Sequence, residues 1–262
     1  SGDERLGYLR GSLKTLLTAL LGKLDELGVE IKTNCKIESI NVDNNKVISV
    51  STNNTTFDKG PFLFTIPTLF LAPLVKNIAP ELHKELENIE YFGAVCTVLE
   101  MNKPLSEIYW LNVADEGFPF GGVIEHTNFI DKENYQGKNV AYLSRYFAHS
   151  EPIAKMSDDE IKEVMLAPLA KIYPDFKMED VIKVHVFKTM TAATVCDLNF
   201  STKVPNSKTS IEGMHIASMP HIYPDERSVN NSIRVAAEVT KQMGFDSGFV
   251  PKGQSMSGML GF

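Results

Sequence analysis

The sequence has little cysteine, a single tryptophan and no long apolar run. Its three cysteines, Cys35, Cys96 and Cys196, are widely spaced and odd in number. This argues against a disulfide framework and a C-x-x-C metal pair, and it favours a reducing compartment such as the cytoplasm. No stretch is long and apolar enough to span a bilayer, and no signal peptide is recognisable. We therefore expect a cytoplasmic chain without a membrane span or a metal ion.

Basic charge is also scarce. The chain carries 26 Lys and Arg against 33 Asp and Glu, a net charge of −7, which argues against a nucleic-acid partner. With 43% hydrophobic and 23% charged side chains over 262 residues, the composition is that of a globular protein with one large or two modest domains. We expect a small-molecule substrate as the partner and allow for a homodimer.

The first 75 residues combine helix and strand patterns. A helix is predicted over 12–27, with Ser12 as its cap, Gly28 as its stop and seven leucines on one face. Strands are predicted over 29–34 and 62–67. A hairpin over 36–42 and 46–52 lies between them, and its turn carries two asparagines.

The middle of the chain is rich in strands. Alternating patterns predict strands over 91–101, 108–113, 119–126, 139–147 and 181–189. Short helices are predicted over 73–90, and Ser157 opens a capping box for a helix that runs to about residue 172. This order favours an antiparallel or mixed sheet.

The last third contains a short apolar strand, a polar loop and a helix. Ser228 is a predicted N-cap and Gly244 a predicted stop. The start of a helix carries N–H groups and partial positive charge, so an electron-rich ligand edge could rest there. A plain capped surface helix explains the pattern as well. The predicted apolar side of the helix is Val229, Ile233, Ala236, Ala237 and Val239.

Two long motifs resemble a known superfamily. The run from Ile222 to Asn230, Ile-Tyr-Pro-Asp-Glu-Arg-Ser-Val-Asn, resembles the C-terminal flavin-binding segment of the amine oxidase, phytoene desaturase and protoporphyrinogen oxidase-like oxidoreductases. The runs 118–129 and 137–146 resemble a second signature of a bacterial branch of that superfamily. This chain departs from the family pattern at two places. Asp225 and Glu226 stand in the reverse of the family's Glu-Asp order, and Ser228 replaces a glycine that lets the backbone approach a ligand closely.

The resemblance implies an α/β (α+β) fold, in which a mixed-sheet substrate domain is inserted between remnants of a doubly wound FAD-binding domain. The implied division is 1–75 and 206–248 for the FAD domain, 76–205 for the substrate domain, and 249–262 for a flexible tail. The cofactor is FAD. The implied cofactor contacts are Ile37, Thr65, Pro67, Ser218, Met219, Tyr223, Arg227, Ser228, Val229 and Asn230.

Substrate contacts are predicted at four further positions. Tyr8 and Arg10 lie between glycines and could line the substrate side of a flavin, although a helix lead-in explains them nearly as well. On a predicted strand, His126 and Asn128 share a face and either could bind a polar substrate. A satisfied histidine at a strand end is an equal alternative for His126.

Two charged side chains have structural alternatives. Glu125 is predicted to pair with Arg145 on the neighbouring strand. Arg227 is predicted either to bind an anion or to bridge to Asp225. No residue is identified as a general base.

The sequence lacks a G-x-G-x-x-G strand-turn-helix, which holds the pyrophosphate in flavin enzymes of this type. The chain also begins Ser-Gly-Asp without an initiator methionine. We expect a fragment of an FAD-dependent oxidoreductase that binds FAD weakly or not at all and is inactive by itself. The alternatives are a stand-alone non-catalytic binding or oligomerisation module, and a relative of non-redox flavin mutases.

Overall fold

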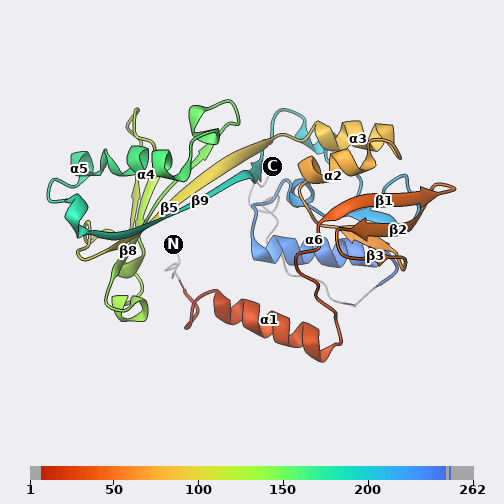
Figure 1. Ribbon diagram of the computed structural model, residues 1–262, viewed down its shortest axis with the longest axis horizontal. Helices are drawn as coiled ribbons and strands as arrows, with labels where there is room; N and C mark the ends of the chain where they lie inside the picture. The colour runs from red at the N-terminus through yellow and green to blue at the C-terminus, as the bar shows by residue number, and fades with distance from the viewer. Residues whose placement is uncertain (1–6, 246–247, 249–262) are drawn as a thin grey trace, which may run out of the picture.

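The computed structural model describes residues 7–245 and 248 and contains three sheets, shown in Figure 1. The predicted tail, 249–262, lies outside the described residues. The α/β fold class predicted from the sequence is confirmed. The strands are β1 (Ile37–Asp43), β2 (Lys46–Thr52), β3 (Thr56–Phe57), β4 (Phe62–Phe64), β5 (Tyr91–Met101), β6 (Trp110–Asn112), β7 (Gly122–Glu125), β8 (Asn139–Phe147), β9 (Val181–Thr194) and β10 (Met214–Ile216).

Six α-helices are present among the described residues, together with six short 3₁₀ helices. The α-helices are α1 (Lys14–Glu26), α2 (Thr68–Val75), α3 (Pro80–Glu87), α4 (Asp158–Leu166), α5 (Leu169–Ile172) and α6 (Val229–Gln242). The 3₁₀ helices are η1 (His126–Asn128), η2 (Lys132–Tyr135), η3 (Pro152–Ala154), η4 (Met178–Asp180), η5 (Phe200–Thr202) and η6 (Met219–Ile222).

The smaller body combines segments from the first and last thirds of the chain, β1 to α3 and the segment around β10. The hairpin β1–β2 turns at Asn44 and Asn45, which have φ of 46° and 61°; asparagine tolerates this left-handed region better than most residues. β4 pairs in parallel with β10, which follows about 150 residues later. A core from β1, β2, β4, β10, α2 and α3 forms beneath them.

The larger body is a five-stranded antiparallel sheet in the order β6-β7-β8-β5-β9. Alternate residues of one sheet face pack against α4 and α5. Leu99 and Leu143 of the sheet and Ile161 and Leu169 of the helices are fully buried there. The other face is half-exposed, and among residues 7–245 no helix comparable to α4 covers it (Figure 1). The sheet therefore presents one open face to a ligand or to further polypeptide.

The predicted strand over 29–34 is wrong, because the structure leaves this segment without a paired neighbour. Val29 and Ile31 are 47% and 53% exposed. A β-prone segment needs another strand to satisfy its backbone groups. No other described segment adds a strand there.

The helix predicted over 12–27 forms over Lys14–Glu26, but its leucine face has no partner among the described residues. None of the helix residues is buried, and α1 lies apart from both bodies in Figure 1. The N-cap of the helix is Leu13 and not Ser12 as predicted, although the Ser12 side chain accepts a hydrogen bond from the Lys14 N–H at 3.2 Å. The exposed fractions of Leu13, Leu16, Leu17, Leu20 and Leu21 lie between 47% and 63%.

Two further expectations need correction. The helix predicted from the Ser157 capping box does form, but it breaks around Pro168, which is the N-cap of the separate helix α5. Proline removes a backbone N–H from the helix ladder, so the helix does not run on unbroken to residue 172. The strand predicted over 119–126 stops at Glu125, and His126 and Asn128 belong to η1.

We predict that Gly93→Ala destabilises the larger sheet. Gly93 pairs across strands with Phe147, and a Cβ at residue 93 would lie 2.2 Å from the buried Phe147 ring. Overpacking of this kind costs about 1–3 kcal/mol, which urea unfolding would measure. Gly121→Ala is the control, because a Cβ there meets open space; equal stability of the two variants would contradict the packing account.

Candidate functional site

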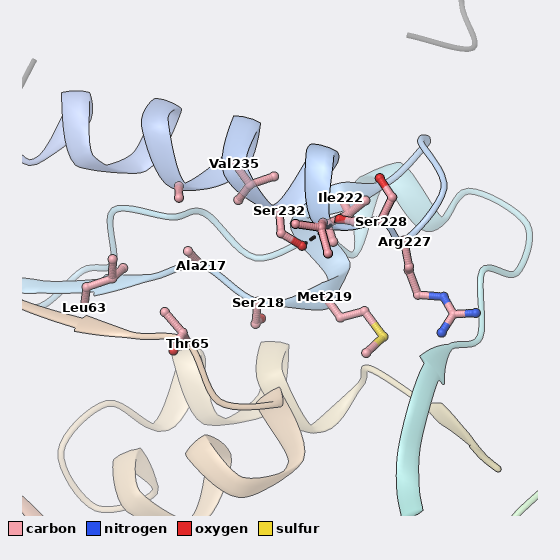
Figure 2. A pocket seen from close by; sticks show the side chains of 12 residues that line it. Leu63, Thr65, Ala217, Ser218, Met219, Ile222, Arg227, Ser228, Ser232 and Val235 are labelled. Atoms are coloured by element: carbon pink, nitrogen blue, oxygen red, sulfur yellow. Dashed lines mark hydrogen bonds between the residues drawn. The ribbon is translucent and has the colours of Figure 1, made fainter. Parts of the chain in front are cut away.

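A groove lies between α6 and the carboxyl ends of β4 and β10 (Figure 2). Its volume is about 470 Å³. In open α/β folds ligands bind beyond the carboxyl ends of parallel strands, where a helix begins. The lining residues are Leu63, Thr65, Ala217, Ser218, Met219, Ile222, Arg227, Ser228, Val229, Ser232, Val235 and Ala236.

The groove wall on α6 consists of small and apolar side chains. Val229, Ser232 and Ala236 repeat at a spacing of three and four residues, so they share one face of the helix. The predicted apolar side is confirmed at Val239, which is buried, and is wrong at Val229 and Ile233, which are exposed, while Val235 is buried without having been predicted. The small side chains allow a flat ligand to approach the helix closely.

The start of α6 is fixed by side-chain hydrogen bonds. Ser228 caps the helix as predicted, and its Oγ accepts from the Asn231 N–H at 3.1 Å. Asn231 donates in turn to the Glu226 carbonyl at 2.8 Å. Asp225 pairs with Arg234 of the same helix at 2.8 Å. These contacts hold the positive end of the helix dipole beside the groove, where an anionic ligand edge would be stabilised.

One of the two alternatives for Arg227, an ion pair with Asp225, does not form. Arg227 donates to the Ala192 carbonyl of β9 and to the Tyr146 hydroxyl, the latter at 3.2 Å. Its guanidinium also lies 5.6 Å from the centre of the Tyr146 ring, a cation–π contact. Among the described residues that line the groove, Arg227 alone is charged. It therefore joins the groove to the open face of the larger sheet.

A second cavity of about 490 Å³ lies beside the β1–β2 hairpin. Ile37 and Cys35 line it, and Leu63 and Thr65 line both this cavity and the groove. An extended ligand in the groove could therefore reach the hairpin past these two side chains.

Glu125 does not pair with Arg145, contrary to the prediction. Its carboxylate accepts from the Leu105 N–H at 2.8 Å and from the Ser106 hydroxyl at 2.6 Å, and burial raises its pKa. Arg145 pairs with Glu151 instead. Glu125 thus anchors the loop before β6, which is a structural role.

His126 and Asn128 are not on one strand face. The Nε2 atom of His126 lies 2.6 Å from the Tyr135 hydroxyl, and burial lowers the pKa of the imidazole. Asn128 donates to the carbonyls of Ser106 and Ile108 at 2.9 and 3.2 Å. The Asn128 amide is consequently engaged in holding a loop, whereas His126 lies within a group of tyrosines.

The structure brings six of the ten predicted cofactor residues to the groove. Ile37 lines the adjoining cavity, Pro67 caps α2, Asn230 lies in the first turn of α6 outside the groove lining, and Tyr223 packs its ring 5.2 Å from Phe200. The six are Thr65, Ser218, Met219, Arg227, Ser228 and Val229.

Tyr8 and Arg10 line a separate cavity with Tyr135. Sequence reasoning also missed some groove residues. Ser232 and Ala236 could have been found from the helical spacing that starts at Val229, whereas Leu63 and Ala217 depend on the pairing of β4 with β10, which no local pattern reveals.

The described residues contain no group of three or more His, Cys, Asp or Glu side chains placed to hold a metal ion. Within the same part of the chain, no helix is both long and apolar enough to cross a membrane.

The chain matches a known protein family over most of its length. Residues 2–223 match the family described as flavin containing amine oxidoreductase. The chloroplastic/chromoplastic 15-cis-phytoene desaturase of Glycine max is 24% identical over 228 residues, which cover 82% of this chain and 39% of the desaturase. The chain thus spans about two fifths of the length of the curated relatives it matches.

Solved structures share the fold. An oxidoreductase from Methanosarcina mazei superimposes with a TM-score of 0.67 at 17% identity, over 90% of this chain and 55% of that one. Reduced UDP-galactopyranose mutase superimposes with a TM-score of 0.71 at 10% identity, over 91% of this chain and 53% of the mutase. At these identities the likeness concerns the fold alone.

We predict that Ser228→Ala and Ser228→Gly separate the capping role from the backbone role of this position. Alanine removes the oxygen that accepts from Asn231 and should lower the unfolding free energy by about 1 kcal/mol, whereas glycine should cost only a few tenths. Urea unfolding of both variants measures the difference. Equal losses would show that the cap does not hold the start of α6.

Proposed function

Because the chain belongs to the flavin containing amine oxidoreductase family, we propose that it forms the part of an FAD-dependent oxidoreductase that faces the flavin ring and the substrate. The part that binds the pyrophosphate would lie outside this chain. When bound, the flavin supplies the acceptor for a hydride taken from a C–H bond of a small organic substrate.

The observation that carries this proposal is the groove at the start of α6. Its walls suit a flat ring, because Leu63, Ala217 and Ala236 are small or apolar and no carboxylate lines it among the described residues. The N-terminal end of α6 would stabilise negative charge at the pyrimidine edge of a reduced flavin. The residues present thus fit the ring half of the cofactor.

The phosphate half of the cofactor has no comparable site in the part of the chain that the structure describes. The sequence contains no G-x-G-x-x-G turn, and backbone N–H groups of such a turn are what hold a pyrophosphate in this type of fold. We propose that residues 1–75 and 206–248 belong to one FAD-binding domain that further polypeptide completes, and that residues 76–205 form the substrate domain.

The exposed leucine face of α1 supports the need for further polypeptide. A helix with this pattern gains most of its stability by burying the apolar face, yet Leu17 and Leu20 are 56% and 55% exposed. The unpaired segment over 29–34 follows directly. A βαβ unit packed against them would cover the leucine face of α1 and give the β-prone segment over 29–34 a strand to pair with.

Two alternatives follow from the same fold. A non-redox mutase would use the groove in the same way, and the likeness to UDP-galactopyranose mutase is compatible with it; anaerobic bleaching of the flavin by substrate without an added reductant would favour the oxidoreductase. A non-catalytic binding or oligomerisation module, including a homodimer, would cover the α1 face without any flavin. A cytoplasmic location is supported by the odd cysteine count.

We predict that the chain alone binds FAD and riboflavin with the same weak affinity. Only the ring half of the cofactor meets a built site, so the added phosphates and adenine should contribute little. Isothermal titration with the two ligands measures this, and the full gene product should retain FAD through purification. The proposal fails if this chain alone binds FAD with micromolar or tighter affinity and riboflavin much more weakly.

We predict that Leu17→Glu combined with Leu20→Glu leaves this chain stable but abolishes FAD retention by the full gene product. Exposed positions tolerate charge within about 0.5 kcal/mol, whereas an uncompensated charge in a buried interface costs several kcal/mol. Thermal unfolding and the flavin-to-protein absorbance ratio provide the two readings. Thr18→Glu, on the opposite side of α1, is the matched control; equal flavin loss in both variants would contradict a buried leucine face.

A further inference from the structure

A path of small side chains crosses the open face of the larger sheet, starting where Arg227 contacts Tyr146. Gly122, Ser144 and Cys96 lie side by side on β7, β8 and β5, and they line a cavity of about 660 Å³ with Trp110 and Tyr146. Their small size makes the floor of this cavity flat. A planar or chain-like molecule could lie on it.

The next row of the sheet, away from Arg227, is bulkier. Ile124, Tyr142 and Val98 are paired neighbours in that row. Because side chains two residues apart share a strand face, Tyr142 lies on the same face as Ser144 and Tyr146. Four residues of strand place Tyr142 about 14 Å from Tyr146. Tyr142 thus marks the far end of the path.

A group of aromatic polar side chains gathers at this far end, and two of them, Tyr8 and Tyr135, line the neighbouring, separate cavity. The His126 ring packs edge-on against Tyr8, Tyr135 and Tyr142, with centroid distances of 5.2, 5.3 and 5.7 Å. His126 and Tyr135 are hydrogen-bonded at 2.6 Å. Three separate segments of the chain, the lead-in to α1, η2 and β8, converge here.

The group can donate hydrogen bonds but carries no negative charge of its own. Burial raises the pKa of Tyr135 to about 12 and also raises the pKa of Tyr142, so both phenols keep their protons at neutral pH. The Tyr135 hydroxyl has two hydrogen-bond partners within the group, the His126 Nε2 atom and the Tyr8 side chain. A phenol that accepts one hydrogen bond becomes the stronger donor.

One carboxylate on this sheet face, that of Glu100, is paired with two basic side chains. Glu100 lies two residues beyond Val98 and is bound by Lys138 at 2.6 Å and by His185 at 2.8 Å. These contacts lower the pKa of Glu100 to about 2. Glu125, next to His126 in sequence, is held by Leu105 and Ser106. The charge of Glu100 is thus compensated, whereas Asp115 lines the cavity over Gly122 and Asp131 lines the cavity of Tyr8 and Tyr135, where Arg10 adds a positive charge.

We propose that the hydroxyls of Tyr8, Tyr135 and Tyr142, oriented by His126, bind the hydrogen-bond-accepting end, such as a carboxylate, of an elongated apolar substrate. The body of the substrate lies over Gly122, Ser144 and Cys96, and its other end reaches Arg227 beside the groove. This assignment rests on the proposed function for the identity of the bound molecule as a substrate, whereas the binding site itself does not need the flavin.

Binding to this chain without flavin tests the proposal. Trp110 is the single tryptophan of the chain and lines the cavity, so quenching of its fluorescence reports occupancy. The two probes are trans-stilbene-4-carboxylate and trans-stilbene, which share one flat body and differ in the acceptor. We expect the carboxylate to bind about tenfold more tightly, as charge-assisted hydrogen bonds imply.

Tyr135→Phe and Tyr142→Phe should each remove most of this tenfold preference and leave the dissociation constant of trans-stilbene unchanged. Tyr173→Phe is the matched control, since Tyr173 belongs to the buried core on the opposite face of the sheet; it should change neither constant. Tyr8→Phe provides a variant at a partly exposed position, 39% exposed, should a core tyrosine prove necessary for folding.

The proposal is overturned if wild type binds neither probe, binds both equally, or keeps its preference when the phenols are removed. Riboflavin titration of the same samples reports on the groove separately. If the chain prefers the carboxylate probe but does not bind riboflavin, the proposed function is refuted and this site is retained. If it binds riboflavin but shows no preference between the probes, this site is refuted and the proposed function is retained.

Discussion

The parallel pairing of β4 with β10 is the contact on which the groove depends. It joins Phe62–Phe64 to Met214–Ile216 across most of the chain, and it buries Phe64, Met214 and Ile216 almost completely. Both strands end at the same edge, and the loop that follows β10 leads directly into α6. Without this pairing, Leu63 and Thr65 would not face Ser218 and Ser228, and the helix dipole would point at solvent.

The second constraint is that an apolar surface must be covered. The larger sheet meets it on one face with α4 and α5, and the smaller body meets it with α2 and α3. The leucines of α1 and the open sheet face are left uncovered among the described residues. On our account the first surface is reserved for the pyrophosphate-binding part of the protein and the second for substrate, with Arg227 at the junction between cofactor and substrate.

Local patterns in the sequence were sufficient for most elements. The strands 91–101 and 139–147 were predicted with the bounds they have, and the caps at Ser157 and Ser228 form as expected, because periodicity and capping depend on neighbouring residues. The strand predicted over 29–34 does not form, because a strand needs a pairing partner that the described residues do not supply. The predicted partners of Glu125 and Arg227 were wrong for a similar reason. Several hydrogen-bond and ion-pair partners lie near each side chain in the fold, and the sequence does not indicate which of them it contacts. Of the group around His126, the sequence indicated Tyr8 and His126 as candidate site residues. It did not indicate Tyr135 and Tyr142, because no local motif distinguishes them from core aromatic residues.

The central claim is that the start of α6 faces a flavin ring, and amide chemical shifts measure this most directly. Titration of riboflavin into the ¹⁵N-labelled chain should shift the amide signals of Ser228, Val229 and Ser232 together with those of Leu63 and Ala217, because all five lie around one groove. Shifts confined to other parts of the chain, or no shifts at saturating riboflavin, would contradict the account.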